Sequence, residues 1–512
     1  MRKLRTHTFF LIALVFGLLS FAQTGIAFAE ELRLGIIHTN DLHGCLAPFE
    51  VEGAALMGGF ARCAAAIKSA RSDGSYNWLV LDAGDASEGT PYSELTRGMS
   101  AFNCMNAMGY DAMCLGNCEF DYGFPHVLEY AETADFPLLC ANISFPFVGK
   151  RPIPPFAVFE RGGYRIGVIG LLRETVSQNM YYRLGNQIGT YPVIPSATDL
   201  ARYLRGVGCD IVIALTHQGY DHDLELANAV PELDVIVGGH SHTTLAEPTR
   251  VGDVIVTTDG ELGQTLGVLK LEFSRDETAG RFALASFSEA FEPLGPGHPA
   301  DEAVAALADE YVQKIDAQLG EVVCTSAQEF PVDRVRYEES AFADMVADAL
   351  KEITGADCVL FTGGHFQAPI KAGPVTFGDL YDALPHNNVL MKVTVSGDKL
   401  REMLDWGGTQ YGAGFPHIAG MRVRYVDAKL AEATIGGKPI DDSAQYTVLM
   451  NDFLACSTAG FPIHENPFGP GCTGLRQRDL FVEWARKQKA LAKETDGRVV
   501  FEWVNMAPPG KE

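Results

Sequence analysis

Carboxylate, amide and imidazole side chains recur along the first half of this chain in a pattern that suits metal binding. The set comprises Asp41, His43, Asp85, Asn117, His217, His240 and His242. Their oxygen and nitrogen atoms are ligand types that divalent metal ions take from proteins. Seven ligands are too many for one ion and fit two ions that share a carboxylate, an arrangement that activates water for attack on a phosphoryl group.

The spacing of these side chains supports a shared site. Asp41 and His43 stand two residues apart, as do His240 and His242, and in extended backbone such pairs point to the same side. Glycines nearby permit tight turns and the close approach of ligand atoms. These glycines are Gly44, Gly84, Gly116, Gly238 and Gly239.

Five short apolar runs must position the candidate ligands. The runs lie within residues 32–37, 78–81, 112–115, 211–219 and 235–242. Each is too short for an ordinary helix, and such runs predict buried parallel strands. Because ligand sites of α/β sheets form outside the carboxyl ends of the strands, the runs predict a metal centre at one rim of the N-terminal sheet. A lone histidine after a strand is more often structural, but five such ends in one domain favour the metal centre.

The rest of the chain predicts two domains. Up to about residue 290, strands alternate with helical patterns, which indicates an α/β sheet layered by helices. The additional elements expected there are a helix at 58–69 and strands at 164–172, 253–257 and 268–273. A Pro/Gly-rich stretch at 291–299 marks a boundary, and a connecting helix is expected over 300–319.

The second domain is expected to begin near Glu321. Apolar residues at helical spacing predict an amphipathic helix over 340–353. The other elements expected are helices after Thr376 and at 398–406, strands at 358–361, 389–395 and 446–450, and a hairpin across Gly436-Gly437.

The N-terminus has the features of a secretory signal peptide. Three basic residues precede an apolar core at 9–21, and Ala27-Phe28-Ala29 forms a cleavage site before Glu30. The core is shorter than the roughly 20 residues that a membrane span needs. We therefore expect residues 1–29 to be removed, and the mature protein to be periplasmic or secreted without a membrane anchor.

Charge and cysteine usage narrow the class of protein further. The formal net charge is −25, which disfavours binding of nucleic-acid polymers and anionic membranes but allows a small anion in a metal-rich pocket. The eleven cysteines contain no CxxC pair, so neither a zinc ribbon nor a thioredoxin motif is present. We expect most of them to be core thiols, and we expect a monomer.

The ordered motifs D-x-H, G-D, G-N-x-E, T-H and G-G-H-S-H resemble those of the calcineurin-like metallophosphoesterases. In the second half, SGDKLREML, ALPHNN and YTVLMNDFLA resemble the C-terminal domain of the bacterial periplasmic 5'-nucleotidase / 2',3'-cyclic phosphodiesterase family. The resemblance covers nearly the whole mature chain. It implies a four-layer calcineurin-like α/β sandwich over 30–295, a linker helix over 296–320 and an α/β C-terminal substrate-binding domain over 321–508.

The same resemblance assigns roles to the metal ligands. One ion would be held by Asp41, His43 and His242. The other would be held by Asn117, His217 and His240, with Asp85 as the bridge. The ions would be two of Zn, Mn, Fe or Co, with the identity open. The implied activity is that of a secreted two-metal phosphoesterase that hydrolyses phosphate monoesters, first of all nucleotides, through a metal-activated hydroxide.

One catalytic position departs from the family. The family's Gly-Asn-His-Glu is Gly-Asn-Cys-Glu here, so Cys118 replaces the histidine that stabilises the transferring phosphoryl group, while its partner Asp121 is kept. Cys118 could be a neutral thiol donor, a thiolate metal ligand or an oxidisable blocking group. Removing one such donor costs about 10²–10³ in rate. A catalytically weakened metal- and nucleotide-binding protein is therefore an alternative.

The substrate domain departs as well. Arg336 matches a phosphate-binding arginine, Asn388 a base-contacting asparagine and Phe453 one of two base-stacking aromatics. His386 stands in the other aromatic position, and Gln367 replaces a phosphate-clamping arginine. The ribose-binding Gly-Gly-Asp is Ser-Thr-Ala at 457–459. Loop divergence without any ligand is the alternative at each position, and the losses also allow a cyclic phosphodiester, a sugar phosphate or a sulfur ester as substrate.

Overall fold

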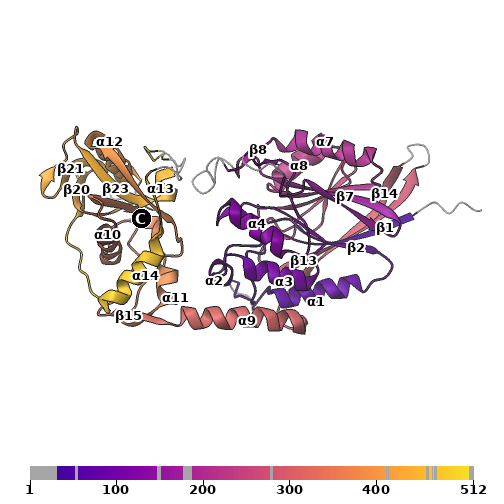
Figure 1. Cartoon of the computed structure of the whole chain (residues 1–512), viewed down its shortest axis with the longest axis horizontal. Helices are drawn as coiled ribbons and strands as arrows, with labels where there is room; N and C mark the ends of the chain where they lie inside the picture. The colour runs from indigo at the N-terminus through magenta and orange to yellow at the C-terminus, as the bar shows by residue number, and fades with distance from the viewer. Residues whose placement is uncertain are drawn as a thin grey trace, which may run out of the picture.

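The computed structural model describes residues 31–51, 56–146, 151–176, 187–276, 281–410, 412, 414–456, 461–463, 465 and 470–506. The expected signal peptide, residues 1–29, and the tripeptide 457–459 lie outside these residues. Figure 1 shows two domains, the first in indigo to magenta and the second in orange to yellow, with helix α9 (Glu302–Leu319) running between them. None of the described helices has the length and apolar character needed to cross a lipid bilayer.

Two stacked sheets form the centre of the first domain. Within the described residues, one has six strands in the order β14-β13-β1-β2-β3-β4 and the other has six in the order β11-β12-β10-β9-β7-β6. The first consists of β1 (Glu31–Thr39), β2 (Asn77–Asp82), β3 (Ala112–Cys114), β4 (Leu138–Leu139), β13 (Thr265–Asp276) and β14 (Arg281–Pro293). The second consists of β6 (Phe156–Arg161), β7 (Tyr164–Leu172), β9 (Ile211–His217), β10 (Val235–Gly239), β11 (Thr249–Val251) and β12 (Val254–Thr257). The short strands β5 (Ile143–Ser144) and β8 (Gly189–Thr190) pair separately.

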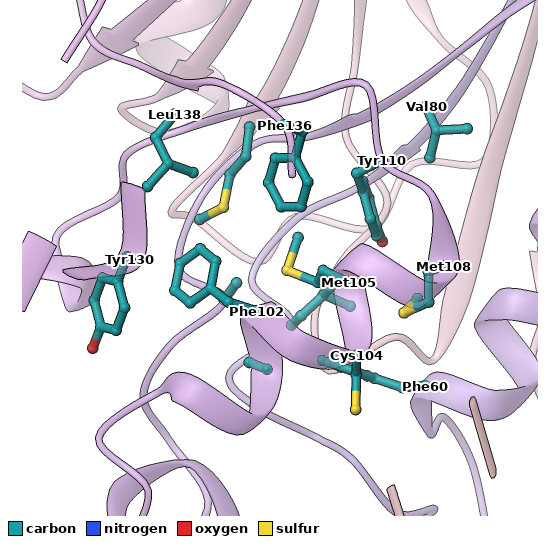
Figure 2. Close-up of a cluster of buried hydrophobic side chains, with 14 of the residues drawn as sticks. Phe60, Val80, Phe102, Cys104, Met105, Met108, Tyr110, Tyr130, Phe136 and Leu138 are labelled. Atoms are coloured by element: carbon teal, nitrogen blue, oxygen red, sulfur yellow. The ribbon is translucent and has the colours of Figure 1, made fainter. Parts of the chain in front are cut away.

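Helices cover the outer face of each sheet. The first sheet packs on α1 (Phe60–Arg71), α3 (Met99–Met108) and α4 (Phe124–Thr133), through a core that includes Phe60, Phe102 and Tyr110 (Figure 2). The second packs on α7 (Val193–Gly206) and α8 (Tyr220–Ala229). Aliphatic side chains such as Leu34 and Ile213 fill the space between the sheets. The domain is therefore the four-layer α/β sandwich that the sequence resemblance implied.

The strand predictions for the metal centre are confirmed as β1, β2, β3, β9 and β10. The pattern of residues alone predicted one sheet, however, and this was wrong because the five strands divide between two. A strand that is buried on both faces has the same apolar sequence in either sheet of a sandwich, so its composition does not assign it to one of them.

The second domain combines a five-stranded sheet with two smaller ones in the described part of the chain. The larger sheet contains β19 (Pro416–Ala419), β16 (Cys358–Thr362), β23 (Gln445–Asn451), β18 (Val389–Ser396) and β24 (Cys472–Arg476). The smaller sheets contain β17 (Gly373–Thr376), β15 (Val322–Ser326) and β25 (Ala490–Leu491), and β22 (Lys438–Pro439), β21 (Lys429–Ile435), β20 (Met421–Val426) and β26 (Val499–Glu502). Its helices are α10 (Ala341–Thr354), α11 (Phe377–Ala383), α12 (Gly397–Thr409), α13 (Asp452–Cys456) and α14 (Gln477–Gln488).

The predicted helices at 58–69, 300–319, 340–353 and 398–406 are confirmed as α1, α9, α10 and α12. Helix α10 begins after Ser340, whose hydroxyl caps the first turn, and ends at Gly355 in the left-handed conformation. The expected boundary at 291–299 begins inside a strand, because β14 continues to Pro293. All eleven cysteines lie in the described residues and all are free thiols, eight of them buried.

A buried ion pair joins the two domains. Glu94, at the end of α2 (Pro91–Glu94), accepts hydrogen bonds from the Tyr381 hydroxyl of α11 and from the Arg478 guanidinium of α14. The Arg478 side chain is only 1% exposed, and its guanidinium carbon lies 4.1 Å from the centre of the Tyr381 ring. Glu94 therefore neutralises the buried Arg478 cation at the contact between the two domains.

We expect Glu94→Ala to lower the free energy of unfolding by about 3–5 kcal/mol, because it leaves the Arg478 cation buried without its partner. Urea unfolding of the full chain measures this change. Glu338→Ala removes the exposed ion pair with Arg334 and serves as the control, with an expected loss of about 0–1 kcal/mol. Equal losses of unfolding free energy in the two variants would show that the Glu94–Arg478 ion pair does not stabilise the protein as proposed.

Candidate metal centre

The carboxyl ends of strands from both sheets meet at one place. In the second sheet, His217 at the end of β9 pairs with Gly239 of β10, directly before His240. In the first sheet, the loops after β1 and β2 are joined by hydrogen bonds from the Asp41 amide to Gly84 (2.9 Å) and from the His43 amide to Asp85 (2.9 Å). The two sheets are connected where the His240 amide donates to Asp41 Oδ2 at 2.9 Å.

Left-handed backbone is concentrated at the candidate ligands. The φ angle is positive at Asp41 (49°), His43 (47°), Asp85 (59°), His240 (83°) and His242 (51°). We predicted extended backbone at the Asp41/His43 pair and at the His240/His242 pair, and this prediction was wrong. Tight loops rather than straight strands aim these side chains inward. Residues other than glycine rarely adopt this conformation, and it is typical of functional sites whose surroundings hold the strain.

One cluster of ligand atoms is formed by Asp41, His43 and His242. The distance from Asp41 Oδ1 is 3.3 Å to His242 Nε2 and 3.9 Å to His43 Nε2, and the two Nε2 atoms lie 3.3 Å apart. The Nδ1 atom of His43 donates to the Glu88 carbonyl at 2.6 Å, and that of His242 donates to Glu261 at 2.7 Å. These bonds orient both rings so that Nε2 faces the cluster, as expected of metal-binding histidines.

A second cluster is formed by Asp41, Asp85 and His217. His217 Nε2 lies 3.2 Å from Asp85 Oδ2 and 4.0 Å from Asp41 Oδ1, while its Nδ1 donates to the Ala83 carbonyl at 2.7 Å. Burial by itself would raise the pKa of Asp85, but the charge of the nearby His217 holds that pKa well below its usual range. Burial likewise lowers the pKa of His217, and Asp85 outweighs it and raises that pKa to about 10.

Within the described residues, three buried atoms at or beside the two clusters have no hydrogen-bond partner. They are Asp41 Oδ1, Asn117 Oδ1 and His217 Nε2. Buried polar atoms normally find a partner, and unsatisfied ones cost free energy. Each of the three is an atom that a divalent metal ion could bind, and carboxylate, amide and imidazole ligands together suit transition metals. The residues present therefore fit a pair of divalent ions.

His240 lies beside the second cluster. Its ring centre is 5.1 Å from that of His217, and the planes meet at 69°. Its Nε2 accepts a hydrogen bond from Arg173 Nη1 at 2.8 Å. Burial, reinforced by the neighbouring positive charge of His217, lowers the pKa of His240 to about 4. The sequence analysis did not identify Arg173, although it directly follows one of the predicted strands, as the ligands do.

The turn after β3 carries the departure from the family motif. Cys118 opens the short helix η1 (Cys118–Phe120), its amide donates to Asp85 Oδ1 at 2.7 Å, and its thiol donates to Asp85 Oδ2 at 3.1 Å. Burial and the charge of Asp85 raise the pKa of the Cys118 thiol well above its usual value. Asp121 lies at the carboxyl end of η1, and its charge adds to this shift. This environment favours the protonated thiol. Cys118 Sγ also lies within 4.8 Å of ligand atoms of His43 and Asp85, in a third group of candidate metal ligands.

Glu119 is a further residue that the sequence analysis did not single out. Its fully buried carboxylate accepts four backbone hydrogen bonds, from the amides of Asp85, Ala86, Ser87 and Gly116, at 2.7–3.1 Å. It thereby ties the loop after β2 to the loop after β3. Its place in the G-N-x-E motif was the sequence feature that could have identified Glu119.

The substrate-domain candidates are not gathered in the same way. Asn388 is buried, and its carbonyl accepts from the Gln477 amide at 2.9 Å. The Gln367 side chain donates to the Gly364 carbonyl at 2.5 Å. Arg336, Gln367, His386 and Phe453 are all exposed at the surface of this domain. In the described part of the chain, no hydrogen bond or ion pair joins Arg336, Gln367 and Phe453 to one another.

Comparison with known proteins gives matches over most of the chain. The family model of calcineurin-like phosphoesterases matches residues 34–244, and that of the 5'-nucleotidase C-terminal domain matches residues 319–466. The chain is 27% identical to a probable 5'-nucleotidase of Treponema pallidum, over 92% of this chain and 95% of that protein.

Solved structures show the same similarity. The crystal structure of a 5'-nucleotidase precursor from Thermus thermophilus matches with a TM-score of 0.65 and 26% identity, over 93% of this chain and all of that one. A putative 5'-nucleotidase from Staphylococcus aureus, solved in complex with alpha-ketoglutarate, matches with a TM-score of 0.73. At 18% identity over 92% of this chain and 99% of that one, it supports the fold alone.

Proposed function

This chain belongs to the calcineurin-like phosphoesterases that carry a 5'-nucleotidase C-terminal domain, and we propose that it releases phosphate from nucleotides at a centre of two metal ions. Its family makes it a metal-dependent hydrolase of phosphoric esters. The nucleotide substrate is inferred from relatives named 5'-nucleotidases. The observation that carries the two-metal assignment is the set of three buried, unsatisfied ligand atoms at Asp41, Asn117 and His217.

The residues divide into two groups of ligands around a shared carboxylate. Asp41, His43 and His242 would hold one ion. Asn117, His217 and His240 would hold the other, with Asp85 between them. When bound, two such ions lower the pKa of a shared water and neutralise charge on the phosphoryl group. The protein itself fixes the ligand loops through Glu119, and the Cys118 thiol provides a weak, uncharged hydrogen-bond donor beside Asp85.

The direct test is metal removal and replacement. We expect the chelator-treated protein to release no phosphate from a nucleoside monophosphate or a chromogenic phosphate ester, and we expect added Mn or Zn to restore release, because the nucleophile depends on the ions. Phosphate release and metal content are measured on the same samples. Release that persists after complete metal removal would refute the proposal.

A substitution at position 118 tests whether the natural enzyme has a reduced kcat. We expect Cys118→His to raise kcat by about tenfold, because an imidazolium carries a charge that the thiol lacks; one electrostatic donor supplies at most about 10²–10³. The measurement is steady-state hydrolysis of a nucleoside monophosphate at saturating metal. Cys114→Ser, in the buried strand β3, is the control for altering a thiol in this region. An unchanged kcat would show that the natural centre does not lack this charge.

A different ester is the alternative substrate, and Gln367 favours it. Its amide bonds to the backbone of its own turn, at a position where an arginine would clamp phosphate. A panel of nucleoside monophosphates, cyclic nucleotides, sugar phosphates and sulfur esters distinguishes these substrates. Highest kcat/KM for a nucleoside monophosphate supports the leading proposal.

We also propose that the protein is exported. The supporting feature is the basic and apolar N-terminal segment with its Ala27-Phe28-Ala29 site, which lies outside the described residues. N-terminal sequencing of the mature protein should begin at Glu30.

A further inference from the structure

We propose that Arg173 binds the phosphoryl group of the substrate and supplies the positive charge that position 118 lacks. The inference rests on the proposed phosphoesterase function and extends it by one residue. It starts from the end of a sixth strand, β7, which contributes no residue to the predicted ligand set.

The backbone of Arg173 is fixed to the metal centre. Strand β7 runs parallel to β9, with Leu172 paired to the candidate ligand His217. Arg173 is the next residue, and its amide donates to the His217 carbonyl at 3.0 Å. Its position therefore follows from the same strand ends that place the ligands.

The side chain reaches a second ligand. Arg173 Nη1 donates to His240 Nε2 at 2.8 Å. A guanidinium is always a donor, so Nε2 must present its lone pair, and the neutral ring carries its proton on Nδ1. An ion bound at Nε2 would take this lone pair, and an ion bound at Nδ1 would require the proton on Nε2. Metal binding through either nitrogen thus ends the Arg173–His240 hydrogen bond.

The released guanidinium would lie beside a metal ligand with its N–H groups free. Such a fork of donors matches the geometry of phosphate oxygens and often binds them in pairs. Arg173 is half-buried and also lines a cavity of about 420 Å³ together with Gln218, Pro192 and Glu225. A small substrate could therefore approach the guanidinium from the cavity. A series of contacts links Arg173 to position 118: the His240 ring packs edge-on against His217, His217 Nε2 lies 3.2 Å from Asp85 Oδ2, and Asp85 accepts from the Cys118 thiol.

A structural role for Arg173 predicts different results. If Arg173 only held the His240 ring in place, its removal would weaken metal binding first. If it binds the phosphoryl group, its removal should leave the metal content intact and reduce affinity for an oxyanion. Metal content and anion affinity therefore separate the two roles without reference to turnover.

The experiment uses the full-length, Mn-loaded protein and the variants Arg173→Gln, Arg173→Lys and Arg202→Gln. Arg202 is the matched control, because it lies on the surface of α7 and pairs with Glu232. Metal content is measured per chain, affinity for inorganic phosphate by calorimetry, and kcat/KM with a chromogenic phosphate monoester. We expect Arg173→Gln to keep its metal and to lose about 10²-fold in phosphate affinity and kcat/KM. Arg173→Lys should recover part of both, and Arg202→Gln should change neither.

A second test starts from the Cys118→His variant. It asks whether a positive charge at position 118 makes the charge of Arg173 less important. If Arg173 supplies the missing charge, Arg173→Gln should cost about tenfold or less in that background, a smaller loss than in the natural chain. Unchanged phosphate affinity in Arg173→Gln, or loss of metal together with phosphate affinity, overturns the inference. If the natural protein binds phosphate through Arg173 but hydrolyses no ester, the proposed function fails and the inference about phosphate binding stands.

Discussion

Asp85→Ala will lower metal-dependent phosphate release by at least about 10³-fold, because it removes the carboxylate that we propose to bridge the two ions. Asp85 lies 3.2 Å from His217 Nε2 and accepts both the amide and the thiol of Cys118. Its loss would also remove the largest of the charges that raise the pKa of His217. Phosphate release at saturating Mn, with metal content measured on the same sample, checks the result.

The control for this prediction is Asp253→Ala. Asp253 is an exposed carboxylate in the turn between β11 and β12, where its partner is Arg250. Its replacement should change neither metal content nor rate. If Asp85→Ala kept two ions per chain and a rate within tenfold of the natural protein, the bridging role of Asp85 would be excluded.

The sequence predicted which ligands lie near one another, because residues that follow parallel strands lie at the same edge of a sheet. Buried parallel strands are recognisable from apolar composition, and the residues after them share one edge. This logic placed Asp41, Asp85 and His217 in one neighbourhood, and the structure has their ligand atoms within 4.8 Å of one another. Neither the division of the strands between two sheets nor the left-handed backbone at Asp41 could be derived in this way. Both depend on packing between segments distant in sequence.

The residues that support the ligands were harder to foresee. Glu261 orients His242, and Arg173 contacts His240, yet neither belongs to a recognisable local motif. Their roles arise from loops and strands that meet only in the folded chain. The sign available for Arg173 was its place after β7, a strand of the same apolar type as those that precede the ligands. A polar residue at the end of each such strand is therefore a candidate site residue, even outside a known motif.

The substrate domain was predictable in its elements and not in its binding surface. Its helices and strands follow from apolar periodicity, as α10 and α12 illustrate. Recognition of a nucleoside depends instead on exposed side chains such as Arg336, in a turn, and Phe453, in the short helix α13, whose positions no periodic pattern constrains. Those assignments therefore stay predictions for the substrate panel to test.

Glu119→Gln is the second change for which we expect a large effect, and it acts on the scaffold of the centre. Both carboxylate oxygens of Glu119 accept backbone amides, Oε2 from Asp85 and Gly116, and Oε1 from Ala86 and Ser87. Glutamine keeps the shape but turns one oxygen into an NH₂ group, which would face two N–H donors in a fully buried place. Leaving buried donors unsatisfied costs about 1–3 kcal/mol each, so we expect a loss of about 3–5 kcal/mol in the free energy of unfolding.

The same substitution should weaken metal binding, because the loops after β2 and β3 carry Asp85 and Asn117. Urea unfolding with and without Mn measures both effects, since an ion that binds only the folded chain stabilises it in proportion to its affinity. The stabilisation by Mn should therefore be smaller in Glu119→Gln than in the natural protein. Glu129→Gln, at an exposed carboxylate on α4 that pairs with His126, is the matched control and should behave like the natural chain. A Glu119→Gln protein with natural stability and full Mn stabilisation would mean that the four amides do not hold the ligand loops in place.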